Sequence, residues 1–174
     1  VNWLLLNPEL SKNIGGNIMS DYSVTVVWNR KVDESFIDNK YNRGHNWQFD
    51  GGVVVPASSS AHIVPLPYSV EANVDPEEAF IASLSSCHML VFLSIAAKRK
   101  YLIDSYADKA IGVMDTDSVG RLSMTKVTLR PKVTFAGERQ PSFEQIEKMH
   151  HQSHEQCFIA NSVKTEVVTV PIYE

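Results

Sequence analysis

The chain has 174 residues, and its 16 Lys and Arg against 20 Asp and Glu give a formal net charge of -4. This length is typical of one domain that buries a core without metals or disulfides. Because the basic residues are outnumbered and scattered along the chain, neither nucleic acid nor a membrane is expected as a partner.

The beginning of the sequence has the pattern of an extension. Residues 1–18 contain a short apolar burst without a basic region or a small-residue cleavage site, so they do not resemble a secretory signal. Met19 opens a segment that is typical of a strand, and we expect a single domain at 19–174 after an extension at 1–18 that is artificial or reflects a mis-set start. A cytoplasmic location is expected, where Cys87 and Cys157 are poor candidates for a structural disulfide.

Alternation of apolar and polar residues predicts strands in the first part of the domain. A first strand is expected at 22–30 and a second at 46–56, with a break at two consecutive glycines. The Pro- and Ser-rich segment 56–76 is expected to be a long loop.

A long helix is predicted after this loop. Asp75 suits the N-cap, Pro76 suits the first helical position, and Glu78 completes a capping pattern. The helix carries no charge from Ala79 to Ala97, but several serines and a histidine dilute its hydrophobicity. We therefore interpret it as a buried central helix and not as a membrane span.

The remainder of the chain contains strands and one more helix. Strands are expected at 106–114 and 127–135, joined as a hairpin by a turn at 116–121. A second helix at 141–156 and a last strand at 163–172 follow. Since strands and helices do not alternate in βαβ units, this order predicts an α+β domain.

Two segments that contain the cysteines resemble the OsmC/Ohr family of peroxide-reducing proteins. They are VDPEEAFIASLSSCH, which ends at His88, and HEQCFIANSVKTEV, which begins at His154. The resemblance extends from about Tyr22 to the C-terminus. It implies an OsmC-like fold, with antiparallel sheets around a long central helix in an intertwined homodimer. It also implies the two-cysteine reduction of organic hydroperoxides.

The resemblance assigns roles to individual residues. Cys87 matches the peroxidatic cysteine, Cys157 the resolving cysteine and Glu77 the active-site glutamate, while the family's arginine matches Arg43, with Arg30 as the alternative. A guanidinium would stabilise a thiolate, and a carboxylate would orient the guanidinium. Attack on the peroxide would leave a sulfenic acid on Cys87, which would then form a disulfide with Cys157.

An organic substrate is expected because the helix around Cys87 is apolar. Phe80, Met89 and Phe92 on that helix, together with Phe158 after the second cysteine, are the candidate substrate-binding residues. No cofactor is expected, and the resemblance implies that an external dithiol, such as a lipoyl-type dithiol, reduces the disulfide.

Two alternatives to this interpretation stay open. His150 and His154 lie four residues apart with Cys157 three residues further on, which is compatible with metal ligation. Because a structural zinc site needs a fourth ligand and none is evident nearby, no metal is expected. The second alternative is a non-catalytic module. It would use the apolar cleft expected around Cys87 to bind a small or lipid-like ligand, or would sense redox state.

Helix geometry separates two of the candidate catalytic residues. At about 1.5 Å per residue, Glu77 and Cys87 are about 15 Å apart along the helix axis. One helix does not easily present both side chains to one peroxide. If both act on one substrate, as the resemblance implies, we expect Glu77 to come from the other chain of the homodimer.

Overall fold

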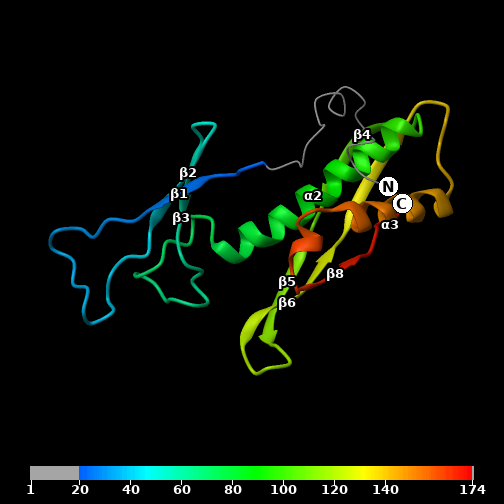
Figure 1. Ribbon diagram of the computed structural model, residues 1–174. Coiled ribbons are helices and arrows are strands. Elements are labelled where there is room, and N and C mark those ends of the chain that lie inside the picture. Colours follow the sequence, from blue (N-terminus) through cyan, green and yellow to red (C-terminus); the bar gives the residue numbers. More distant parts are fainter. Residues whose placement is uncertain (1–19, 174) are drawn as a thin grey trace. The chain divides into compact units, whose positions relative to one another are not determined.

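The computed structural model describes residues 20–173, which form two compact units at 20–79 and 80–173 (Figure 1). The extension expected at 1–18 lies outside the described residues. The strands are β1 (Val24–Val27), β2 (His45–Phe49), β3 (Val54–Ala57), β4 (Leu102–Asp108), β5 (Ile111–Thr116), β6 (Leu122–Leu129), β7 (Pro131–Ala136) and β8 (Glu166–Thr169). The helices are α2 (Pro76–Lys98), α3 (Phe143–Gln156) and the short 3-10 helix η2 (Ala160–Ser162).

The first unit is an antiparallel sheet in the order β1-β2-β3. The prediction of a single strand at 46–56 is wrong, because the chain reverses between Phe49 and Val54 and forms two paired strands. Gly52 has a φ of +84°, a conformation that side chains disfavour, and this makes the reversal possible. Residues 58–75 then form the predicted long loop.

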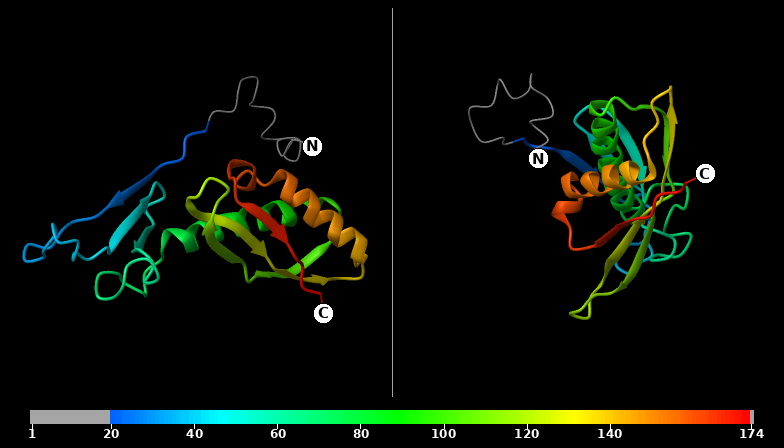
Figure 2. Two further views of the ribbon diagram at one scale, coloured as in Figure 1. Left: turned by 90° about the horizontal axis from the view of Figure 1, so that it is seen from below. Right: turned by 90° about the vertical axis from the view of Figure 1, so that its right-hand side faces the viewer.

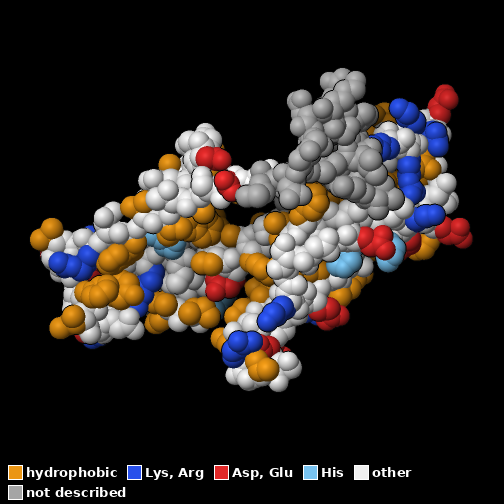
Figure 3. Space-filling model, in the orientation of Figure 1, with side chains coloured by type: hydrophobic (Ala, Val, Ile, Leu, Met, Phe, Trp, Pro, Cys, Tyr) orange, Lys and Arg blue, Asp and Glu red, His pale blue; other side chains and the backbone are white. Residues whose placement is uncertain are grey.

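Hydrophobic side chains are exposed on this unit, as Figure 3 shows. They include Val24 and Val26 of β1, Phe49 of β2 and Val54 of β3. Isolated exposed apolar side chains are ordinary, whereas several on one small sheet are unusual.

The helix α2 begins as predicted. The Asp75 side chain accepts a hydrogen bond from the Glu78 backbone N–H at 2.7 Å, and the Glu78 carboxylate accepts one from the Asp75 N–H at 3.3 Å. Among the described residues, α2 is the one helix long and apolar enough to cross a membrane, a test that core helices of soluble proteins also pass. Its buried residues include Leu84, Phe92 and Ala96, but only 33% of its most apolar window is buried, so the prediction of a buried helix holds in part.

The second unit contains two further sheets. The strands β4 and β7 pair antiparallel, while β6 pairs antiparallel with β5 and parallel with β8. The predicted hairpin is confirmed for β5 and β6, but the strands expected at 106–114 and 127–135 are each divided. The Asp108 carboxylate accepts a hydrogen bond from the Arg130 backbone N–H at 2.6 Å, and Pro131 has no N–H to donate. Both strands therefore break at this point and continue in different sheets.

The two helices lie on the same side of the strands β4 to β8 in both views of Figure 2. The helix α3 begins with a capping box between Ser142 and Gln145, as its sequence predicts. Met149 of α3 and Phe92 of α2 are fully buried in one core cluster, which β4 and β7 also contact. The result is the predicted α+β fold, with its core between the helices and the strands.

Candidate functional site

The structure brings the two cysteines together. Cys87 lies in the middle of α2, and Cys157 is the C-cap of α3. Their thiols lie close enough to interact, and both cysteines are free. Cys87 is half-buried, whereas Cys157 is only 1% exposed. Two residues far apart in the sequence therefore form one thiol pair, in which Cys87 is the more accessible.

The end of α3 holds the Cys157 thiol in place. The Cys157 backbone N–H donates to the carbonyl of His154 at 3.3 Å, and the Ala160 N–H donates to Cys157 Sγ at 3.4 Å. Burial raises the pKa of Cys157 to about 12, and the hydrogen bond with Cys87 also raises it.

Glu77 and the two candidate arginines lie in the first unit. One carboxylate oxygen of Glu77 is buried and has no hydrogen-bond partner among the described residues. The Arg43 guanidinium donates to the carbonyls of Tyr41 and Asn39 and lies 3.8 Å from the centre of the Tyr41 ring. Arg30 donates to carbonyls of its own loop. Neither arginine pairs with Glu77 among the described contacts, so the roles of Glu77 and Arg43 stay predictions.

The four candidate substrate-binding residues differ in their surroundings. Phe92 is fully buried, and its ring packs against Tyr106, Phe135 and His150. The packing therefore makes Phe92 a core residue. Phe158 is exposed, Met89 is partly exposed, and Phe80 is partly buried beside the second core cluster.

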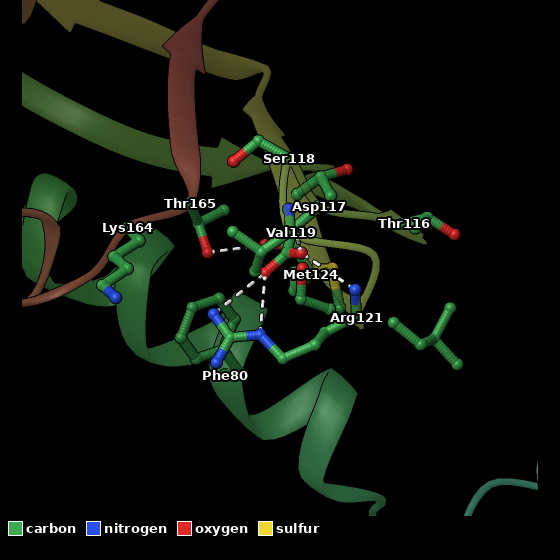
Figure 4. Close-up of a pocket in the computed structure, with 12 residues that line it drawn as sticks. Phe80, Thr116, Asp117, Ser118, Val119, Arg121, Met124, Lys164 and Thr165 are labelled. Carbon is green, nitrogen blue, oxygen red and sulfur yellow. Dashed lines mark hydrogen bonds and ion pairs between the residues drawn. The ribbon is translucent and has the colours of Figure 1, made fainter.

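Phe80 also lines a pocket that the sequence did not predict. This open pocket has a volume of about 820 Å³, and the turn between β5 and β6 and the residues before β8 form its other walls. Figure 4 shows Arg121 joined to Asp117 beside Phe80, and the distance from Arg121 Nη2 to the Asp117 carboxylate is 3.2 Å. The sequence indicated only a turn here, because the contact with Phe80 depends on packing between α2 and the hairpin.

A buried histidine pair lies next to the thiols, and the sequence did not predict it. His88 Nε2 and His150 Nδ1 are 3.1 Å apart, and the two residues are only 1% and 3% exposed. Burial, followed by the charges of His150 and His154, lowers the pKa of His88 to about 3, and burial lowers that of His150 to about 4. Both rings are therefore neutral at physiological pH. The one available signal was a histidine directly after a cysteine in an uncharged helix.

The metal alternative that the sequence left open involves residues of α3 and its C-cap. Within residues 20–173 no group of three or more His, Cys, Asp or Glu side chains is placed to hold a metal ion. His151, a neighbour of the buried histidine, instead pairs with Glu155 at 3.2 Å.

These features define an α+β protein with a thiol pair between its long helix and the end of its second helix. The model of the OsmC-like protein family matches residues 70–171. The chain belongs to this family, and the predicted resemblance is confirmed. Among curated proteins there is no match.

Solved structures with the same fold include one close relative. An OsmC-like protein of unknown function from Vibrio cholerae is 62% identical, with a TM-score of 0.88 over 88% of this chain and 100% of that chain. An organic hydroperoxide resistance protein from Elizabethkingia anophelis is 13% identical, with a TM-score of 0.68 over 91% and 100% of the two chains. One from Legionella pneumophila is 12% identical, with a TM-score of 0.63 over 89% and 97%. The last two show the shared fold.

Proposed function

We propose that the protein is a thiol-dependent peroxidase that reduces organic hydroperoxides to alcohols in the cytoplasm. The observation that carries this proposal is that the Cys87 and Cys157 thiols lie close enough to interact. A half-buried cysteine in contact with a buried one is the arrangement that two-step thiol chemistry requires. Family membership supports the same reaction, as do structural relatives that are named organic hydroperoxide resistance proteins.

The reaction begins at Cys87, because it is the more accessible cysteine. Its thiolate attacks the O–O bond and takes a hydroxyl group, while the alkoxide takes a proton and leaves as the alcohol. The Cys157 sulfur then attacks the sulfenic acid on Cys87. The hydroxyl leaves with the thiol proton as water, and a disulfide forms. An external dithiol, such as a lipoyl-type dithiol, reduces the disulfide, and no other cofactor takes part.

We further propose a homodimer in which Glu77 and Arg43 complete the site. The buried carboxylate oxygen of Glu77 supports this proposal, since an unpaired buried carboxylate is costly and a second chain can supply a donor. The exposed apolar side chains on β1 to β3 also fit a surface that a second chain covers. In this arrangement Glu77 of one chain serves Cys87 of the other.

The test is a pair of single-turnover experiments with cumene hydroperoxide. Cys87→Ser should consume no peroxide, whereas Cys157→Ser should consume about one equivalent and stop as a sulfenic acid that dimedone labels. Wild-type protein should lose both thiols. Equal consumption by the two variants would show that the roles are assigned wrongly.

A second candidate function is a binding module, and the pocket beside Phe80 favours it. A volume of about 820 Å³ is within the range of small-molecule sites. Its walls combine the apolar Phe80 and Met124 with the cationic Arg121 and Lys164, which suits a lipid-like ligand. Thiols that stay unchanged after treatment with an alkyl hydroperoxide would favour this candidate over the peroxidase.

A further inference from the structure

The helices that carry the two cysteines are also joined by the buried histidine pair. His88 directly follows Cys87 on α2, and His150 precedes Cys157 by seven residues on α3. Seven residues are about two helical turns, so His150 and the end of α3 at Cys157 share one face. That face therefore contacts α2 at two places, through a hydrogen bond at His88 and a thiol contact at Cys87.

Helix geometry shows why these two contacts define the position of α3. Adjacent residues on α2 are about 1.5 Å apart along its axis but about 100° apart around it. The two residues that meet them, His150 and Cys157, are about 10 Å apart along the axis of α3. A helix that meets both cannot run parallel to α2 at this point. Two contacts of this kind fix both the position and the rotation of α3.

The surroundings make the histidine contact specific. The His150 ring stacks on Phe92 with 4.3 Å between the ring centres, and Val91, Ile95 and Met149 are buried in the same core cluster. The facing nitrogens of two neutral imidazoles satisfy each other only when one is a donor and the other an acceptor. In an apolar core, a shift of α3 would leave both nitrogens unpaired, which is costly. Apolar packing alone lacks this directional requirement.

We propose that the His88–His150 hydrogen bond positions Cys157 for its attack on modified Cys87. This inference rests on the proposed function, and it adds two positioning residues that act through Cys157. The first step of the reaction, at Cys87, depends less on the placement of α3, because Cys87 lies on α2 and is the more accessible thiol. The second step depends on it more strongly, because a misplacement of about 1 Å can slow a reaction by about 100-fold.

The second step can be measured without any peroxide. The Cys87 thiolate attacks the disulfide of Ellman's reagent, so that one thionitrobenzoate leaves and the other stays bound to Cys87 as a mixed disulfide. The Cys157 sulfur then attacks the Cys87 sulfur, the protein disulfide forms, and thionitrobenzoate leaves as its thiolate, whose absorbance gives the rate. One disulfide replaces another, so no further oxidant is needed.

Substitutions at the histidine pair should slow this release. We expect His88→Leu and His150→Leu each to slow it at least about tenfold, and the double variant to be no slower than the singles, since the pair acts as a unit. Release of the first thionitrobenzoate, which reports the reaction of Cys87, should change less than about twofold. His88→Gln and His150→Asn each place an amide near the position of the imidazole nitrogen that makes the hydrogen bond. Each of these variants should therefore release thionitrobenzoate within about threefold of the wild-type rate.

A matched control separates positioning from general loosening of α3. Arg99, just after α2, donates to Gln152 of α3 at 2.7 Å. Gln152→Ala removes that bond at the C-terminal end of α2, and we expect the release rate to stay within about threefold of wild type. If Gln152→Ala slows release as much as the leucine variants do, or if folded leucine variants release at the wild-type rate, the inference is refuted.

Two further outcomes are also decisive. If the leucine variants do not fold, His88→Asn serves as the broken pair, because its amide is one methylene shorter than that of His88→Gln. Equal rates for these two variants would refute the inference. If wild-type protein passes the release assay but leaves cumene hydroperoxide unchanged, the proposed peroxidase function fails while the positioning role stands.

Discussion

Burial of the Cys157 thiol should make it almost inert to alkylation in the folded protein. Burial and the bond to Cys87 raise its pKa from an ordinary 9.0 to about 12. At pH 8 the thiolate fraction then falls from about one tenth to about one ten-thousandth, and the thiolate is the form that reacts. We therefore expect Cys157 to react with iodoacetamide about 1000-fold more slowly in the folded chain than in urea.

The assay follows the mass of the Cys157 peptide in a Cys87→Ser variant, which has a single thiol. Because burial is the largest cause of the raised pKa, this variant keeps most of the effect. The rate in the folded protein should also rise about tenfold for each pH unit well above pH 9, where an ordinary thiol levels off. If the alkylation rates of Cys157 in the folded and urea-unfolded states differ by less than about tenfold, the reasoning is contradicted.

Two further predictions concern stability. The pKa values of His88 and His150 lie below the ordinary 6.5, at about 3 and about 4, so folding favours the neutral rings. The contribution of the two neutral rings to the free energy of unfolding is fully present above pH 6.5 and is lost as the pH falls towards 4. At pH 5 we expect a loss of about 2 kcal/mol for each histidine. Urea unfolding at pH 7.5 and pH 5 measures this loss. A variant with leucine at both positions should lose less, and an equal loss would contradict the assignment. Gly112→Ala should cost about 1–3 kcal/mol, because an added Cβ would lie 2.6 Å from Ile81 Cδ1, whereas nothing lies within 4 Å of such a Cβ at Gly51. Similar losses for Gly112→Ala and Gly51→Ala would show that this crowding is relieved at little cost.

Features that depend on neighbouring residues were predictable from the sequence. The starts of both helices follow from capping residues three positions apart, Asp75 with Glu78 and Ser142 with Gln145. The turn between β5 and β6 and the α+β order of elements follow in the same way from local patterns. The spacing of the cysteine motifs was sufficient to indicate the family that residues 70–171 confirm.

Features that depend on contacts between distant segments were decided only by the tertiary structure. The division of the strands needs Asp108 to meet the Arg130 backbone, 22 positions away. A helix pattern places Phe92 near Cys87 but does not show that its ring fills the core. The partner of His88 is 62 positions away, so no local pattern distinguishes a buried pair from a solvated histidine. Short-range hydrogen bonds and periodicity are recorded in consecutive residues, whereas burial and pairing depend on which elements pack together.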